Sequence, residues 1–172
     1  MTVDALREED RLDFFANISH DRKVLETFVC GYAERPEDVD FDRYLAVEDM
    51  MAVRQKDTGR LIGTVLICRK EGDSCEIGYC LGSEHWRKGY ATEAVKAFIG
   101  YCFLEKNFQK VYASFFTGNE ASRRVMEKCG MVYSHFAPNE MTYLGIGRDL
   151  TYYVITKSQW EKTLQRTQER TN

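Results

Sequence analysis

Two cations and a glycine stand where a helix is predicted to begin, in the sequence Trp-Arg-Lys-Gly-Tyr-Ala from Trp86 to Ala91. The segment before them has the composition of a short strand, and apolar residues recur at helical spacing after them. A helix start presents unpaired N–H groups and a partial positive charge. Gly89 lets the backbone approach a ligand closely, while Arg87 and Lys88 add charge. These properties suit a bound pyrophosphate.

A second motif begins at Asn119, between a predicted strand over residues 111–116 and a predicted helix over residues 120–129. It reads Asn-Glu-Ala-Ser-Arg-Arg-Val-Met-Glu-Lys-Cys-Gly-Met and ends at Met131. Asparagine is a favourable N-cap residue, so Asn119 taken alone indicates no more than a helix start. Gly130 has the position of a C-terminal helix stop.

Together the two motifs resemble the GNAT-fold N-acetyltransferases. Motif A of that family reads Gln/Arg-x-x-Gly-x-Gly/Ala, and Gly89 and Ala91 match its last two positions, whereas Trp86 departs from the first. An aromatic residue there, in Trp-x-Lys-Gly-Tyr-Ala-Thr-Glu-Ala, is similar to the RimJ/RimL-type subgroup, which acetylates protein N-termini. The segment from Asn119 resembles motif B, Asn-x-x-Ser/Ala followed by Lys-x-Gly-Phe. The resemblance covers roughly residues 50–160.

The resemblance implies acetyl-CoA as co-substrate. Its pyrophosphate is then expected at the residues of the loop and first helical turn, which are Arg87, Lys88, Gly89, Tyr90, Ala91 and Thr92. Its pantetheine arm is expected at the backbone of Cys80 and Leu81, where the family's strand parts from its neighbour, and at the side chain of Asn119. Two interpretations of Ser122 are equally weighted: its hydroxyl donates a hydrogen bond to the thioester sulfur, or it is a first-turn helix residue that is satisfied locally.

Acetyl transfer requires an amine that has lost its proton. An α-amine, with a pKa of about 7.7–8, is roughly one-tenth neutral at pH 7, whereas a lysine-type amine is neutral about once in 2,500, a burden of about 4.6 kcal/mol. Glu76, on the strand that leads to Leu81, is the candidate base, and a structural pairing with a neighbouring strand is an equally weighted interpretation. The family often has a tyrosine that acts as general acid for the thiolate leaving group, and Met126 stands at that position here. Ser122, or the more remote Tyr133 and Tyr152, are the remaining candidates to donate a hydrogen bond or proton to the thiolate.

The six cysteines are predicted to be buried, reduced thiols, because none forms a Cys-x-x-Cys pair and several fall on apolar faces. A nucleophilic Cys80 is disfavoured because no histidine is predictably placed to activate it. The three histidines are scattered, so no metal site is expected.

The composition predicts one soluble domain over residues 1–172. The apolar and charged fractions, 44% and 30%, are ordinary for a globular protein, and a net charge of −3 gives no footprint for nucleic acid. Without an apolar run of 18 residues or a signal peptide, we expect a cytoplasmic protein with no membrane partner, either a monomer or a homodimer. The acidic stretch 34–42 is interpreted as a solvated loop or as a lip that attracts a cationic amine.

The expected fold is α/β: a mixed, mostly antiparallel sheet of six or seven strands with a central splay and helices on both faces. Residues 5–33 predict two short helices broken near His20, with a remnant of a first strand at Leu6-Arg7. Further strands are predicted over residues 50–56, 61–69, 76–81, 111–116, 131–136 and 150–156. Pro138-Asn139 is expected to break the pattern, and Ser158 to Glu161 to cap a terminal helix whose tail frays from Thr163.

The sequence thus predicts an acetyl-CoA-dependent N-acetyltransferase that acts on a primary amine. By subgroup resemblance the leading acceptor is a protein N-terminal α-amine, with a small amine such as an amino acid, polyamine or drug close behind. A non-catalytic acyl-CoA-binding module is the alternative, because the general-acid tyrosine is absent and Glu76 has a structural as well as a catalytic interpretation.

Overall fold

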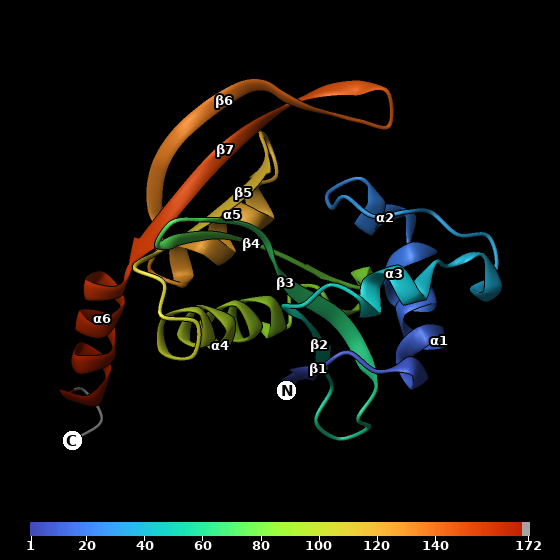
Figure 1. Ribbon diagram of the computed structural model, residues 1–172, viewed down its shortest axis with the longest axis horizontal. Coiled ribbons are helices and arrows are strands. Elements are labelled where there is room, and N and C mark those ends of the chain that lie inside the picture. The colour runs from blue at the N-terminus through green and yellow to red at the C-terminus, as the bar shows by residue number, and fades with distance from the viewer. Residues whose placement is uncertain (170–172) are drawn as a thin grey trace. The chain divides into compact units, whose positions relative to one another are not determined.

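The computed structural model describes residues 1–169, which form seven strands and a set of helices (Figure 1). The sheet has the strand order β1-β2-β3-β4-β5-β7-β6. Its strands are β1 (Thr2–Ala5), β2 (Met50–Arg54), β3 (Leu61–Glu71), β4 (Ser74–Leu81), β5 (Lys110–Phe116), β6 (Val132–Tyr143) and β7 (Ile146–Thr156). The α-helices are α1 (Arg11–Phe14), α2 (Arg22–Leu25), α3 (Phe41–Leu45), α4 (Tyr90–Leu104), α5 (Glu120–Lys128) and α6 (Lys157–Glu169). Shorter helical turns are η1 (Glu8–Asp10), η2 (Phe15–Ser19), η3 (Pro36–Asp38) and η4 (Ser83–His85).

The chain divides into two compact units, each of which is described by itself. The first comprises Met1–Ile67 and Gly78–Phe98, and the second comprises Cys68–Ile77 and the chain from Ile99 onward. The expectation of a single domain over residues 1–172 stays a prediction.

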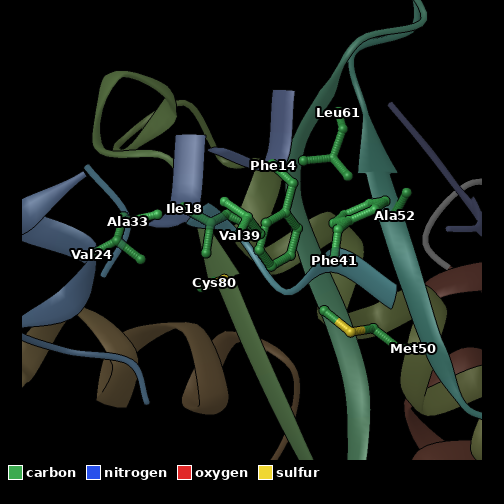
Figure 2. Close-up of a cluster of buried hydrophobic side chains, with 10 residues drawn as sticks. All are labelled: Phe14, Ile18, Val24, Ala33, Val39, Phe41, Met50, Ala52, Leu61 and Cys80. Atoms are coloured by element: carbon green, nitrogen blue, oxygen red, sulfur yellow. The ribbon is translucent and has the colours of Figure 1, made fainter. Parts of the chain in front are cut away.

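In the first unit, β2 pairs antiparallel with both β1 and β3. Strand alternation places Ala52 and Val53 on opposite faces, and both are fully buried, so both faces of this part of the sheet are covered. Figure 2 shows the cluster on one face, where the rings of Phe14 and Phe41 lie 5.3 Å apart. This cluster consists of Phe14, Ile18, Val24, Ala33, Val39, Phe41, Met50, Ala52, Leu61 and Cys80.

In the second unit, β4 and β5 form the parallel pair, which joins Ser74–Ile77 to Lys110–Ala113. The ladder ends there, although β4 continues to Leu81 and β5 to Phe116. β5 pairs antiparallel with β7 over its whole length, and β6 and β7 form a long curved hairpin (Figure 1). The predicted mostly antiparallel sheet with an interrupted central pair is therefore confirmed.

The ends of the chain differ from expectation. The first strand is Thr2–Ala5, ahead of Leu6, and it pairs with β2 over four residues. Strand β6 runs through Pro138-Asn139 to Tyr143 instead of stopping, because a register shift between Ala137 and Met141 absorbs the proline. Its partner β7 consequently begins at Ile146 rather than Leu150.

The terminal helix begins earlier and runs further than predicted. Its capping box is formed by Thr156 and Gln159, not by Ser158 and Glu161. The Thr156 amide donates to Gln159 Oε1 at 2.9 Å, and the Gln159 amide donates to Thr156 Oγ1 at 3.3 Å. The helix continues past Thr163 to Glu169, so the predicted fraying from Thr163 is wrong over the described residues.

All six cysteines are free thiols, but burial is less uniform than predicted: Cys68 is exposed and Cys30 is half-buried, while the other four are buried. Over residues 1–169, no helix is long and apolar enough to span a membrane. In the same range no group of three or more His, Cys, Asp or Glu side chains is arranged to hold a metal ion.

Candidate functional site

The loop before α4, in the first unit, carries a row of amides with no acceptor. Within residues 1–169, the backbone N–H groups of residues 87–91 donate no backbone hydrogen bond, and the amide of Glu93 donates to Gly89 O at 3.1 Å. Gly89 has a φ of +85°, and a Cβ built there would meet nothing within 4 Å. Arg87 also lies in the left-handed region, with a φ of +62°. The loop therefore presents several donors and open space at a helix start, which is the requirement for an anion site.

The loop carries two cationic side chains and is preceded by the carboxylate of Glu84. Arg87 and Lys88 are exposed on it. Burial lowers the pKa of His85, and the nearby charge of Lys88 lowers it further. Tyr90, Ala91 and Thr92, the other predicted pyrophosphate residues, form the first turn of α4.

Hydrogen bonds anchor the loop to the rest of the first unit. The indole Nε1 of Trp86 donates to the carbonyl of Leu81 at 2.7 Å, so this side chain ties the loop to the end of β4. The amide of Gly82 donates to Ile62 O at 2.9 Å. The amide of Ser83 donates to the carboxylate of Asp21 at 2.7 Å, and the same carboxylate caps α2. Trp86 is therefore an anchor of the loop.

The end of β4 lies unusually close to β3. A Cβ added to Gly63 would come within 2.2 Å of the carbonyl oxygen of Cys80, so only glycine fits there. The Cys80 thiol is buried beside Thr64 Oγ1 at 3.4 Å, and burial raises its pKa to about 12. A thiolate is therefore scarce at neutral pH, which argues against a covalent role for Cys80 and leaves its backbone as the useful part.

In the second unit, Asn119 caps α5 as the sequence predicts. Its side-chain oxygen accepts from the amide of Ser122 at 3.2 Å. That bond leaves the two N–H donors of the Asn119 amide for another acceptor. Met126, which replaces the family's tyrosine, is fully buried in the core. Arg123 is held by Glu120 and Glu127, each at 2.6 Å, as expected for a charged helix face.

Glu76 lies in a pocket of about 420 Å³ that belongs wholly to the second unit. Its Oε2 accepts from Arg69 Nη2 at 3.0 Å, and its Oε1 accepts from Ser114 Oγ at 2.7 Å. The side chain is 14% exposed. Both carboxylate oxygens are thus engaged by neighbouring strands, and each retains a lone pair for a further donor.

One wall of this pocket is aromatic. The rings of His135 and Tyr152 stack at 4.4 Å with an interplanar angle of 6°. Burial, followed by the charge of Glu76, raises the pKa of Tyr152, while a hydrogen bond with Ser114 lowers it. Tyr152 therefore stays a neutral phenol at physiological pH. Tyr133, the other remote candidate of the sequence, is 59% exposed on β6.

The sequence interpretation missed Arg69 and Ser114, the two partners of Glu76. A signal for Arg69 was present, because Arg69 and Glu76 stand symmetrically about the turn at Gly72-Asp73 and must face each other across a hairpin. Ser114 depended on the register of the parallel pair, which places Glu76 opposite Tyr112 and cannot be obtained from either strand alone.

The acidic stretch 34–42 is partly neutralised. Arg35 pairs with Asp38 at 2.8 Å, and Arg11 pairs with Asp42 at 3.0 Å. The Arg35 guanidinium lowers the pKa of the Asp38 carboxyl. This pairing favours the solvated-loop interpretation over a lip for cations.

An α/β sheet with an interrupted central ladder, followed by a loop of unpaired amides at a helix start, is an arrangement that suits an anionic ligand. Comparison with known families identifies the family of this chain. Residues 1–132 match the model of the "Acetyltransferase (GNAT) domain". The chain belongs to the GNAT acetyltransferase family.

Relatives of known sequence support this assignment. Protein YkkB of Bacillus subtilis is 43% identical over 82 residues, which cover 46% of this chain and 48% of that one. The protein named "Uncharacterized N-acetyltransferase YoaA", also from Bacillus subtilis, is 33% identical over 108 residues, covering 61% and 60%. The chain thus spans about half to three-fifths of the length of these relatives.

Solved structures share the fold. A GNAT-family acetyltransferase from Bacillus anthracis superposes with a TM-score of 0.80 at 24% identity, covering 91% of this chain and 94% of that one. Spermidine N-acetyltransferase from Vibrio cholerae, solved in complex with CoA and spermine, gives a TM-score of 0.77 at 21% identity, covering 93% and 97%. At these identities the likeness establishes the architecture alone.

Proposed function

We propose that this protein transfers the acetyl group of acetyl-CoA to a primary amine, with a protein N-terminal α-amine as the leading acceptor class. The observation that carries the proposal is the row of unbonded amides over residues 87–91 at the start of α4. Family membership supports it, since one structural neighbour was solved with CoA.

The residues fit such a cofactor. The loop amides, with Arg87 and Lys88, are assigned to the pyrophosphate, together with the first helical turn from Tyr90 to Thr92. The backbone of Cys80 and Leu81 and the amide donors of Asn119 are assigned to the pantetheine arm. Acetyl-CoA supplies a thioester carbonyl when bound, and this chain's residues orient it and manage protons.

Glu76 is assigned as the base. The ammonium form of the acceptor loses one proton to Glu76, and the neutral nitrogen forms a bond to the acetyl carbon while the carbon–sulfur bond breaks. The second proton that this nitrogen loses passes to the thiolate, and Glu76 returns its proton to solvent. Ser122 is assigned to hydrogen-bond the sulfur. The bond that Ser114 donates to Glu76 Oε1 and the bond from Arg69 to Oε2 hold the carboxylate in one orientation.

The test compares two glycines of similar geometry. Gly89 and Gly59 both have positive φ, and both have open space where a Cβ would lie. We expect acetyl-CoA to raise the melting temperature of the native protein and of Gly59→Glu, but not of Gly89→Glu, because the new carboxylate repels the pyrophosphate. With an amine panel, the native protein should release free CoA thiol. A thermal shift without thiol release would instead favour the non-catalytic acyl-CoA-binding module. The absence of any shift in the native protein would contradict the assignment of acetyl-CoA to this loop.

The base is tested by pH. An α-amine with a pKa of about 8 is only a few per cent neutral at pH 6.5 but about nine-tenths neutral at pH 9, so a base matters most at low pH. Glu76→Gln should therefore lower kcat/KM more at pH 6.5 than at pH 9. Glu71→Gln, which removes an exposed carboxylate of the same pocket, should show no such pH dependence. An equal loss at both pH values would count against a base.

A further inference from the structure

The pocket around Glu76 contains a guanidinium whose donors are mostly unused. Arg69 has five N–H donors, of which Nη2 binds Glu76 Oε2 at 3.0 Å. Among residues 1–169, Glu76 is the one hydrogen-bond acceptor that Arg69 has, and the Arg69 side chain is 59% exposed. An anion and a cation with spare donors thus lie next to each other in one cavity of the second unit.

This pair matches a particular arrangement of groups in a ligand. In an α-amino carbonyl unit, the amine and the carbonyl carbon are bonded to the same carbon, so an N–H donor and an oxygen acceptor lie close together. Glu76 can accept from the amine while Arg69 donates to the carbonyl oxygen. A polyamine or a lysine side chain offers no acceptor beside its amine, and a second ammonium group would be repelled by Arg69.

The size and walls of the pocket are consistent with one such unit. Its volume of about 420 Å³ falls within the range of about 300–1,000 Å³ that is usual for small-molecule sites. The stacked rings of His135 and Tyr152 give it a flat face, and Tyr112 lines it as well.

We propose that Arg69 is a specificity-determining residue, which selects acceptors whose amine is adjacent to a carbonyl group. This inference rests on the proposed function. Two sources carry the same chemistry: the first residue of a polypeptide, with an amide carbonyl, and a free amino acid, with a carboxylate.

The test measures a ratio of kcat/KM values for two matched acceptors. Alaninamide carries a carboxamide where 2-aminopropane carries a methyl group, and its amine is also less basic, so the quantity compared is the change of the ratio from the native protein to the variant. Because both are assayed with the same enzyme sample, the ratio does not depend on how much of a variant is folded. Arg69→Met removes the donors, Arg69→Lys keeps a charge without the fork, and Arg166→Met on the exposed face of α6 is the matched surface control.

Arg69→Met should lower the alaninamide to 2-aminopropane ratio by about tenfold to hundredfold, the usual effect of losing a hydrogen bond to a charged group. Arg69→Lys should lower it less, and Arg166→Met should leave it unchanged. Free alanine and an alanyl peptide distinguish the two sources, and a preference for either one over 2-aminopropane that Arg69→Met reduces supports the inference.

Two results would overturn the inference while the proposed function stands. One is a loss for 2-aminopropane as large as that for alaninamide, which would place the effect in the fold, or larger, which would show that Arg69 acts through the base Glu76, on which the more basic amine depends more. The other is an unchanged ratio. Failure of the native protein to acetylate any of these amines is a different result, because it contradicts the proposed function itself.

Discussion

At the scale of single residues, Trp86 departs from the family pattern and has a structural role of its own, a hydrogen bond that ties the loop to β4. The family has glutamine or arginine at this position, whereas this chain has tryptophan. In the structure its N–H is bonded to the carbonyl of Leu81, and the ring is 39% exposed. The indole therefore holds the loop to the strand that precedes it rather than filling a core.

Trp86→Phe should weaken acetyl-CoA binding about fivefold, since a neutral hydrogen bond contributes about 1 kcal/mol and its loss frees the loop. The exposed ring position should keep the stability of the variant close to that of the native protein. Titration calorimetry measures the dissociation constant. Trp160→Phe, on α6, removes an indole that packs against Phe103 and should leave the affinity unchanged. Equal affinities for Trp86→Phe and the native protein would show that this bond does not position the loop.

Residue roles were predictable where they follow from local sequence, and not where they depend on register. The N-cap at Asn119 and the glycine at position 89 could be identified from a few neighbouring residues, because capping and positive φ are local requirements. The contacts of Glu76 with Ser114 join residues 38 positions apart in the sequence, so they required the strand pairing. The roles assigned to these side chains in catalysis stay predictions.

At the scale of elements, β3 and β4 approach each other at Gly63 more closely than a side chain allows. A Cβ there would lie 2.2 Å from the carbonyl oxygen of Cys80 and 2.9 Å from the Cα of Leu81. Backbone atoms cannot move aside as a flexible side chain does, so β3 and β4 would have to separate. Gly100, inside α4, is the opposite case, since its added Cβ would make an ordinary contact of 3.5 Å with Trp160.

Gly63→Ala should therefore reduce the free energy of unfolding by about 1–3 kcal/mol, the usual cost of overpacking. Gly100→Ala should raise it by about 0.5–1 kcal/mol, because alanine is the better helix former. Urea denaturation of both variants beside the native protein measures the difference. A neutral Gly63→Ala variant would mean that β3 tolerates a side chain beside Cys80.

Strands were predicted well where turn residues separate two hydrophobic runs, and less well where pairing with another strand overrides a local turn signal. Asp57-Thr58-Gly59 separates β2 from β3 as turn chemistry requires. Pro138-Asn139 looked like a break, yet the long pairing with β7 extends β6 past it, and the strand absorbs the proline in a register shift. Tertiary pairing decided that case against the local propensity.

At the scale of the chain, Arg54 joins segments that are far apart in sequence. It is a buried arginine, 5% exposed, that donates to Asp4 Oδ1 at 2.6 Å, to the carbonyl of Ala5 at 3.0 Å, and to both carboxylate oxygens of Asp10. Asp10 itself is 3% exposed. One side chain on β2 thus fixes β1 and the turn η1 in the first unit. The hydrogen bonds that Arg54 donates to Asp10 and Asp4 raise its pKa, so the guanidinium stays charged.

Arg54→Met should destabilise the protein by about 3–5 kcal/mol, because it leaves the Asp10 carboxylate buried without its partner. Arg60→Met removes an arginine that is 67% exposed and paired with Asp13, and should cost no more than about 1 kcal/mol. The double variant Arg54→Met/Asp10→Leu should recover much of the loss, because the penalty comes from the unpaired charge rather than from a missing attraction. Urea unfolding of the three variants decides the matter. If the double variant were as unstable as Arg54→Met, the loss would come from the bonds to Asp4 and Ala5, and the buried pair with Asp10 would not be what holds β1 in place.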